Sequence, residues 1–234
     1  MAIAAYLLDI EGTTTPIDFV HKILFPFAKE RIEPFVSGNF EALEGEIKQL
    51  AAERAADTKY SSYFHPNSAP SVAEYLRFLI DVDRKSTPLK SIQGKIWQAG
   101  YESGELRSQI FDDVLPAFER WKTADKTIAI YSSGSVLAQK NLFKYTDHGD
   151  LTPFISDYFD TNVGGKKEVE SYRKIAEALE FEANVVLFVS DVPEELEAAR
   201  SSGLQTALSI REGNAPIDED FTHQAVQTFD ELPN

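Results

Sequence analysis

Polar residues that could take part in a reaction directly follow an apolar run near the start of the chain. The stretch AIAAYLLDI leads into Asp9, Glu11, Gly12 and Thr13. A strand exit would account for one or two of these residues, but two carboxylates beside a glycine and a hydroxyl call for more explanation. Carboxylates packed this closely cannot all stay ionised unless a cation compensates their charge.

Three later positions carry residues that complement these carboxylates. Ser132 and Ser133 follow the apolar run TIAIY, and Asp191 follows NVVLFVS. Lys166 lies in the glycine-containing stretch VGGKK, ahead of a helical pattern. Hydroxyls, turn amides and a lysine are donors that bind phosphate oxygens.

These residue types together predict phosphoryl transfer. Asp9, Glu11 and Asp191 offer only oxygen ligands, for which Mg²⁺ is the natural ion. A carboxylate can attack phosphorus and form an aspartyl-phosphate, and Asp9 is the expected nucleophile. Ser132 and Lys166 are expected to hold the phosphate while its charge is redistributed.

Short apolar runs alternating with amphipathic helices would bring these residues together. Runs of this kind predict buried strands, and their alternation with helices is typical of a parallel sheet in an α/β fold. Strands are predicted at residues 2–10, 127–134, 184–191 and, more weakly, 205–210, with helices at 169–181 and 194–203. Ligands bind beyond the carboxyl ends of parallel strands, so the polar ends should meet there.

The middle of the chain shows little strand signal and predicts a helical insert. Helical patterns cover residues 40–56, 71–83 and 89–106. We therefore expect a catalytic core made of residues 1–17 and 116–234, with residues 18–115 forming an α-helical cap. Closure of a cap would exclude water from the reacting substrate.

Bulk composition excludes several classes of function. The 234 residues carry a formal net charge of −15, which argues against binding to nucleic acid or to an anionic membrane surface. The absence of cysteine excludes disulfides and thiolate chemistry. No apolar run approaches the roughly 20 residues of a spanning helix, and the N-terminus lacks a signal-peptide pattern. A cytoplasmic location is the expectation.

The motifs resemble those of the haloacid-dehalogenase superfamily of phosphohydrolases. DIEGT is similar to the first motif of that superfamily, usually DxDGT, and YSSGS to the second. Lys166 matches the third motif, and the acidic stretch DVPEE the fourth. All four occur in the expected order. The resemblance implies a Rossmann-like parallel-sheet core of the haloacid-dehalogenase type, with an inserted α-helical cap.

Longer stretches narrow the resemblance to the enolase-phosphatase (acireductone synthase) family of methionine salvage. These stretches are DIEGTTTPI, YSSGSVLAQKNLF and FDTNVGGKKEVESYRKIA. The resemblance implies that a small phosphorylated diketone, 2,3-diketo-5-methylthiopentyl-1-phosphate, is enolised and then dephosphorylated to 1,2-dihydroxy-3-keto-5-methylthiopentene. It also implies one Mg²⁺ per subunit and a monomer.

The resemblance further assigns roles to single residues. It implies that Asp9, Asp191 and the backbone carbonyl of Glu11 hold the Mg²⁺, and that Ser132, Ser133 and Lys166 contact substrate. Glu11 replaces the usual second aspartate of the first motif. We therefore suggest that Glu11 serves as acid and base in phosphate loss.

Three other functions use similar residues. One is a different phosphatase of the superfamily, acting on a sugar or acid phosphate; Glu11 with the following TTTP argues against it. Another is a phospho-acceptor of the response-receiver type, which the chain length and the insert disfavour. The third is a halide-removing enzyme, which needs no metal and would leave the acidic excess uncompensated.

Structural roles compete with chemical ones at several positions. Asp191 could cap the helix that begins near Pro193, and Glu195 could support the metal through a water or simply complement the helix dipole. Trp97 and Tyr101 are expected in the core. The four histidines lack ligand spacing and are expected to be structural or exposed: His21, His65, His148 and His223.

Overall fold

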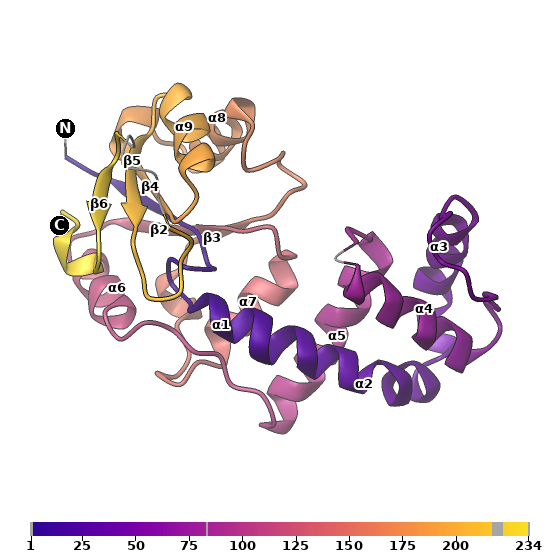
Figure 1. The fold of residues 1–234 in the computed structure, drawn as a ribbon. Helices are drawn as coiled ribbons and strands as arrows, with labels where there is room; N and C mark the ends of the chain where they lie inside the picture. The colour runs from indigo at the N-terminus through magenta and orange to yellow at the C-terminus, as the bar shows by residue number, and fades with distance from the viewer. Residues whose placement is uncertain (1, 83, 217–221, 234) are drawn as a thin grey trace. The chain divides into compact units, whose positions relative to one another are not determined.

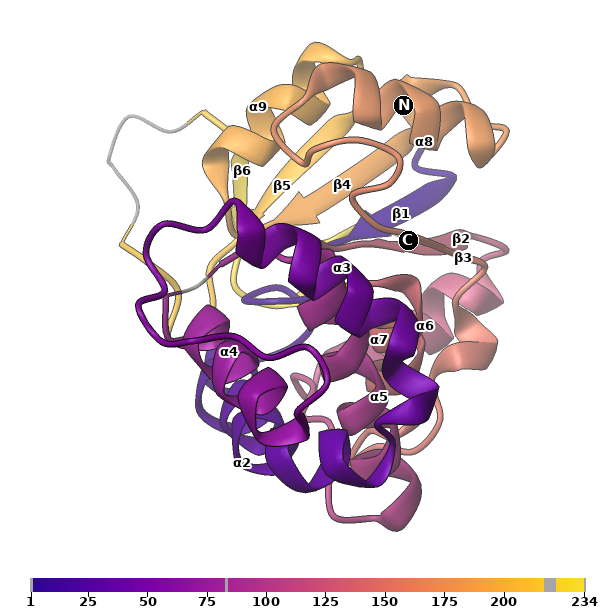
Figure 2. The ribbon, with the colours of Figure 1, turned by 90° about the vertical axis from the view of Figure 1, so that its right-hand side faces the viewer.

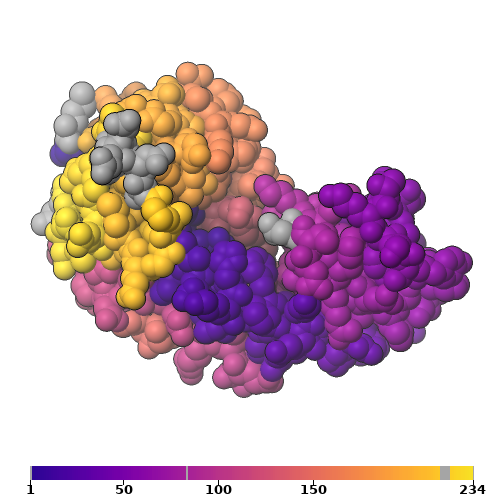
Figure 3. Space-filling model, in the orientation of Figure 1, coloured from indigo at the N-terminus to yellow at the C-terminus, as the bar shows by residue number. Residues whose placement is uncertain are grey.

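A computed structural model describes residues 2–82, 84–216 and 222–233. The chain divides into two compact units, which are described separately. The first comprises residues 1–20 and 107–234, and the second comprises residues 21–106. In the space-filling view, the C-terminal residues, in yellow, gather at one edge of the first unit (Figure 3). In the described part of the chain, no helix is long and apolar enough to cross a membrane.

The first unit is built on a parallel sheet of six described strands, in the order β3-β2-β1-β4-β5-β6 (Figure 1). The strands are β1 (Ala5–Leu8), β2 (Thr127–Tyr131), β3 (Asp157–Phe159), β4 (Val186–Ser190), β5 (Gln205–Ser209) and β6 (Gln224–Val226). The central strands β1 and β4 are buried along their whole length. A strand covered on both faces has no solvent side, which explains its continuous apolar sequence.

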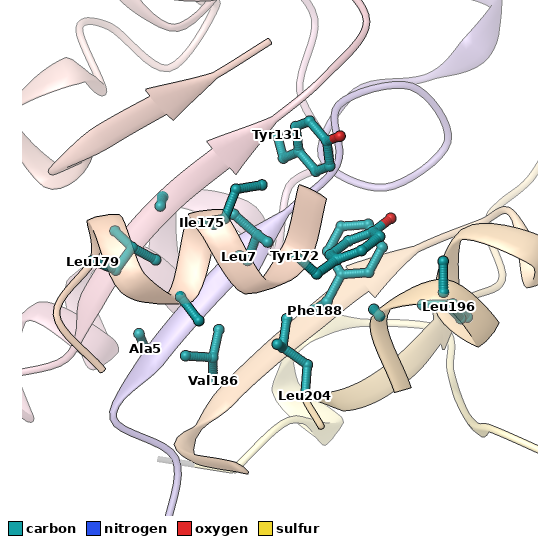
Figure 4. Close-up of a cluster of buried hydrophobic side chains, with 14 of the residues drawn as sticks. Ala5, Leu7, Tyr131, Tyr172, Ile175, Leu179, Val186, Phe188, Leu196 and Leu204 are labelled. Atoms are coloured by element: carbon teal, nitrogen blue, oxygen red, sulfur yellow. The ribbon is translucent and has the colours of Figure 1, made fainter. Parts of the chain in front are cut away.

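Helices cover both faces of this sheet. Figure 2 shows α8 and α9 on one face and α6 and α7 on the other. Their bounds are α6 (Val114–Thr123), α7 (Val136–Lys144), α8 (Val169–Ala178) and α9 (Pro193–Ser201). A short helix, α1 (Ile17–Phe19), follows the first strand. Between the sheet and α8–α9 lies a core of fully buried side chains that includes Leu7, Ile175, Val186 and Phe188 (Figure 4).

The second unit is helical throughout its regular structure. It contains most of a π-helical turn, η1 (Val20–Leu24), then α2 (Phe25–Gly38), a 3₁₀ turn η2 (Glu41–Leu43), α3 (Glu44–Ala55), α4 (Ala69–Asp81) and α5 (Thr87–Ser103). Helix α4 buries Val72, Tyr75, Leu76 and Leu79, which share one helical face by their spacing of three and four residues. This stripe is the apolar face that the sequence pattern indicates.

Two local devices define α5 within the second unit. Ser86 caps its N-terminus by accepting a hydrogen bond from the Leu89 amide at 3.3 Å. Gly104 ends the helix in the left-handed region, with a φ of 79°. In the last turn of the helix, Gly100 lies against the Phe27 ring, where a Cβ would stand 2.3 Å from Phe27 Cζ. Helices α2 and α5 therefore approach closely only because residue 100 has no side chain.

The predicted α/β class with a helical insert is confirmed. All four predicted strands and the predicted helices are present, with small shifts at their ends. The sequence reading missed β3, β6, α2, α6 and α7. The domain limits at 17/18 and 115/116, and the role of the helical unit as a cap, stay predictions.

Candidate active site

Sheet register brings the polar strand ends to one place. Leu8 of β1 pairs with Ile130 of β2 and with Val189 of β4. Asp9 therefore emerges between the ends of β2 and β4. Ser132 is the first residue after β2, and Asp191 is the first residue after β4. The carboxyl-end position of a parallel sheet is where such folds place ligand-binding residues.

A buried network, here called the core charge cluster, consists of Asp9, Lys166, Asp191 and Glu195 with Ser190 between them. Lys166 Nζ lies 2.7 Å from Asp9 Oδ1 and 2.6 Å from Glu195 Oε2. Ser190 Oγ lies 3.2 Å from Asp9 Oδ2 and 3.0 Å from Glu195 Oε2. Since a serine hydroxyl carries one proton, it can donate to only one of these carboxylates at a time.

The turn after β1 explains the run of residues that follows Asp9. The amides of Thr13, Thr14 and Thr15 all donate to the Ile10 carbonyl, at 3.2, 3.0 and 2.9 Å. The Thr14 hydroxyl returns to the Asp9 carbonyl at 3.1 Å. The threonines thus form a tight turn that fixes the backbone on which Asp9 stands.

Gly12 lets an acidic side chain approach this turn. Its φ is +68°, and a Cβ there would stand 2.5 Å from Asp191 Oδ2. The Gly12 carbonyl is held by Ser209 Oγ and Asn214 Nδ2, each at 3.0 Å. A side chain at residue 12 would displace the Asp191 carboxylate, so glycine is required both by backbone conformation and by space.

The core charge cluster holds more acid than base. Burial and the nearby Asp9 carboxylate together raise the pKa of Asp191 to about 7. Burial and Asp9 also raise the pKa of Glu195. Burial alone would lower the pKa of Lys166, but the Asp9 and Glu195 carboxylates outweigh it and raise that pKa, so the ammonium stays charged. Three carboxylates face one ammonium, and this excess favours binding of a cation.

The chain is similar to known proteins over nearly its whole length. Residues 3–203 match the haloacid dehalogenase-like hydrolase family. An enolase-phosphatase E1 of Synechococcus elongatus is 49% identical, with 99% of this chain and 98% of that protein aligned. One of Leptospira borgpetersenii is 48% identical, with 96% of each chain aligned. The chain belongs to the enolase-phosphatase family of the haloacid dehalogenase-like hydrolases. The crystal structure of the UTR4 protein of Saccharomyces cerevisiae has 33% identity and a TM-score of 0.79, covering 98% of this chain and all of that one.

The donor set of this enolase-phosphatase family member fits Mg²⁺. The side chains of Asp9 and Asp191 and the backbone carbonyl of Glu11 supply only oxygen, the ligand type that Mg²⁺ prefers. Among the described residues, no group of three or more histidine, cysteine, aspartate or glutamate side chains is arranged to hold a metal ion by itself.

The remaining predicted site residues, Ser132, Ser133 and Glu11, differ in how exposed they are to solvent. Ser132 is buried, and its Oγ accepts the Gly134 amide at 3.2 Å within its own turn. Ser133, the next residue, is exposed. Glu11 lies half-buried in the turn after β1, where its backbone forms an isolated β-bridge with Thr15. Their contacts with substrate stay predictions.

The alternative role of Asp191 as a helix cap is wrong. The N-cap of α9 is Val192, and no side chain caps it. The Val192 amide instead donates to Ser190 Oγ at 3.2 Å. The Asp191 carboxylate instead lies against Gly12, near the charges of Asp9 and Lys166.

Two members of the cluster lie outside the predicted catalytic, substrate-binding and directly metal-binding residues. Ser190 is fully buried and joins Asp9 to Glu195, and its place as the last strand residue before Asp191 was the available signal. Glu195 was expected to support a metal through water or to complement a helix dipole, yet it contacts Lys166 directly. A hollow of about 630 Å³ elsewhere in this unit, along α7 and β3, contains none of these residues.

The histidine prediction agrees with the structure. His21, His65 and His148 are exposed. His223 is buried, and its two ring nitrogens lie 2.7 Å from Thr206 Oγ1 and 2.9 Å from Glu197 Oε1. Its contacts hold the edge of the sheet rather than the core charge cluster.

Proposed function

We propose that this chain is the Mg²⁺-dependent enolase-phosphatase of L-methionine salvage. It would convert 2,3-diketo-5-methylthiopentyl-1-phosphate to 1,2-dihydroxy-3-keto-5-methylthiopentene and phosphate. One geometric observation carries the proposal: a buried aspartate at the end of the central strand is paired with a lysine inside a cluster that has an acidic excess. Relatives nearly half identical over the whole chain are enolase-phosphatases.

In the phosphatase step, Asp9 is the nucleophile. Its carboxylate oxygen forms a bond to phosphorus while the bond from phosphorus to the substrate oxygen breaks. Lys166, 2.7 Å from Asp9 Oδ1, offers its ammonium to the phosphoryl oxygens. Water then hydrolyses the aspartyl-phosphate and releases phosphate. A bound Mg²⁺, held by Asp9, Asp191 and the Glu11 carbonyl, would neutralise phosphoryl charge.

Glu11 is proposed as the acid and base for this reaction. The leaving oxygen needs a proton as its bond to phosphorus breaks, and Glu11 stands two residues from the nucleophile. Its extra methylene, compared with the usual aspartate, changes which atom it can reach. Glu11→Asp should therefore slow at least one half-reaction; wild-type rates for both would rule out this role.

The activity is tested by following enol absorbance and phosphate release together. The substrate is the diketone phosphate, supplied with Mg²⁺ or with a chelator. We expect the enol signal to precede phosphate release, and both to be lost on chelation. The second candidate is a phosphatase of the same superfamily acting on a small sugar or acid phosphate. It would be favoured if simple phosphomonoesters were hydrolysed and the diketone were not.

The assembly and the location are also part of the proposal. We expect a monomer with one Mg²⁺ per subunit, located in the cytoplasm, and acting on neither nucleic acid nor membrane. The net charge of −15 supports the last point, because phosphate backbones and anionic lipids would repel such a surface. Sedimentation equilibrium would measure the mass of the assembly directly.

A further inference from the structure

Three hydroxyl groups contact three consecutive carbonyl groups in the loop that carries Lys166. Tyr131, Ser171 and Tyr172 donate hydrogen bonds to the carbonyl oxygens of residues 164, 165 and 166, in that order. The distances are 2.9, 2.8 and 2.5 Å. A loop whose successive carbonyls are all held by side chains has little freedom to shift its backbone.

The three donors stand on rigid elements. Tyr131 ends β2, Ser171 and Tyr172 lie in the first turns of α8, and all three are 1% exposed or less. The two tyrosine rings meet edge to face with centroids 5.6 Å apart, and Tyr172 lies 5.0 Å from the Phe188 ring (Figure 4). Burial raises the pKa of both phenols, so their hydroxyls remain protonated donors in the working pH range.

The loop can reach these donors only because it is rich in glycine. Gly164 has a φ of +146°, and a Cβ there would stand 2.1 Å from Ser171 Oγ. Beyond the loop, the Lys166 ammonium lies 5.9 Å from the centre of the Tyr131 ring and continues to Asp9 and Glu195. The same tyrosine therefore contacts both the backbone and the charged end of this segment.

We propose that Tyr131, Ser171 and Tyr172 form a hydroxyl clamp that positions Lys166 against Asp9. They are positioning residues, because their hydroxyls bond to the loop that carries Lys166 and act on the reaction through that lysine. The inference rests on the proposed function, in which Lys166 acts on the phosphoryl group. Fixing the backbone on either side of a flexible side chain reduces the freedom lost when its ammonium meets the transition state.

The test compares Tyr172→Phe with a matched control, Tyr158→Phe. Within the described chain, the Tyr158 hydroxyl is buried and has no hydrogen-bond partner, so its removal deletes a buried hydroxyl without loosening the lysine loop. We expect kcat to fall about tenfold in Tyr172→Phe and about threefold in Tyr131→Phe, and to stay within about twofold in the control. The Kd for Mg²⁺ should change far less than kcat, because the three hydroxyls bond to the lysine loop and not to the side chain of Asp9 or Asp191.

A double-mutant cycle separates positioning from general destabilisation. Added to Lys166→Met, the Tyr172→Phe change should alter the residual rate by less than about twofold, because the group it positions is gone. The clamp is overturned if Tyr172→Phe keeps wild-type kcat, or lowers it equally with and without Lys166. Ser171→Ala provides a second variant that leaves the aromatic packing intact, with an expected loss of about threefold.

The choice of substrate keeps this inference distinct from the proposed function. A wild-type enzyme that hydrolyses a simple phosphomonoester but not the diketone phosphate would overturn the proposed substrate, and the clamp would then be tested on the phosphomonoester. Unchanged kcat in all three clamp variants, with normal turnover of the diketone, would overturn the clamp alone. Failure of the wild type to release phosphate from either compound would overturn both.

Discussion

Two buried charge clusters, one in each unit, differ in how their charges are compensated. In the helical unit, the fully buried Asp57 carboxylate accepts the Lys59 amide at 2.8 Å and the Tyr75 hydroxyl at 3.3 Å, and it pairs with Arg84 at 3.1 Å. One carboxylate faces one guanidinium. In the core charge cluster, three carboxylates face the single ammonium of Lys166.

The pKa shifts of the two clusters have opposite signs. The Lys59 amide and Arg84 lower the pKa of Asp57 despite its burial. Burial and Asp9 raise the pKa of Asp191 to about 7. A balanced cluster stabilises the fold as it stands, whereas an acidic excess destabilises the fold until a cation binds. This difference in charge is consistent with a structural role for the Asp57 cluster and with the cation-binding role proposed for the core charge cluster.

Replacing the nucleophile gives the largest expected effect. Asp9→Asn should lower phosphate release by about 10³-fold or more, because the amide cannot attack phosphorus. Asp57→Asn removes a buried carboxylate of the other cluster and serves as the control. Turnover at comparable rates in the two variants would mean that the clusters do not differ in role.

Asp57→Asn should instead reduce stability. The amide loses the ionic part of its contacts with Arg84 and the Lys59 amide, at an expected cost of about 2 kcal/mol in the free energy of unfolding. Since the folded pKa of Asp57 is lowered, its contribution is present above the unfolded pKa near 3.8 and is lost as pH falls. Urea unfolding at pH 7 measures the change. A variant as stable as the wild type would remove Asp57 from the structural account.

The smallest expected effect has the opposite sign. Asp191→Asn should stabilise the metal-free protein at pH 8 by about 1 kcal/mol, because it relieves repulsion with Asp9 while ending turnover. The pKa of Asp191 is about 7 in the folded state and 3.8 in the unfolded state. Between these two pH values, the folded state holds a proton that the unfolded state has released. Stability of the metal-free wild type should therefore fall as pH rises from 4 to 7, and this slope should be weaker in the variant. A loss of stability in Asp191→Asn would contradict the acidic excess.

The convergence of Asp9, Ser132 and Asp191 could be predicted because it follows from the register of the strands. Asp9, Ser132 and Asp191 each follow an apolar run, and parallel strands place their carboxyl ends together. The direct contact of Lys166 with Glu195 could not be derived this way, since it joins the loop before α8 to the first turn of α9. Sequence spacing alone also gave no sign that the hydroxyls of Tyr131 and Tyr172 would meet this loop.

Three of the elements that were not predicted from the sequence have identifiable causes. Strands β3 and β6 span three residues each, which is too short for an alternating pattern to be recognised. Helix α2 has Pro26 in its first turn and Pro34 in its interior. Because an internal proline is unfavourable in a helix, the sequence did not predict a helix there. Tertiary packing of Phe27, Ile32 and Val36 outweighs the cost of that internal proline.

The most direct test of the acidic excess is a calorimetric titration of Mg²⁺ into metal-free wild type and Asp191→Asn, at pH 6 and pH 8. We expect one ion per wild-type chain, with affinity about tenfold weaker for each pH unit below 7, because the ion must displace the proton from Asp191. Asp191→Asn should bind far more weakly and with little dependence on pH. Wild-type affinity in Asp191→Asn, or an unchanged affinity at the two pH values, would contradict the claim that this cluster is built to hold a cation.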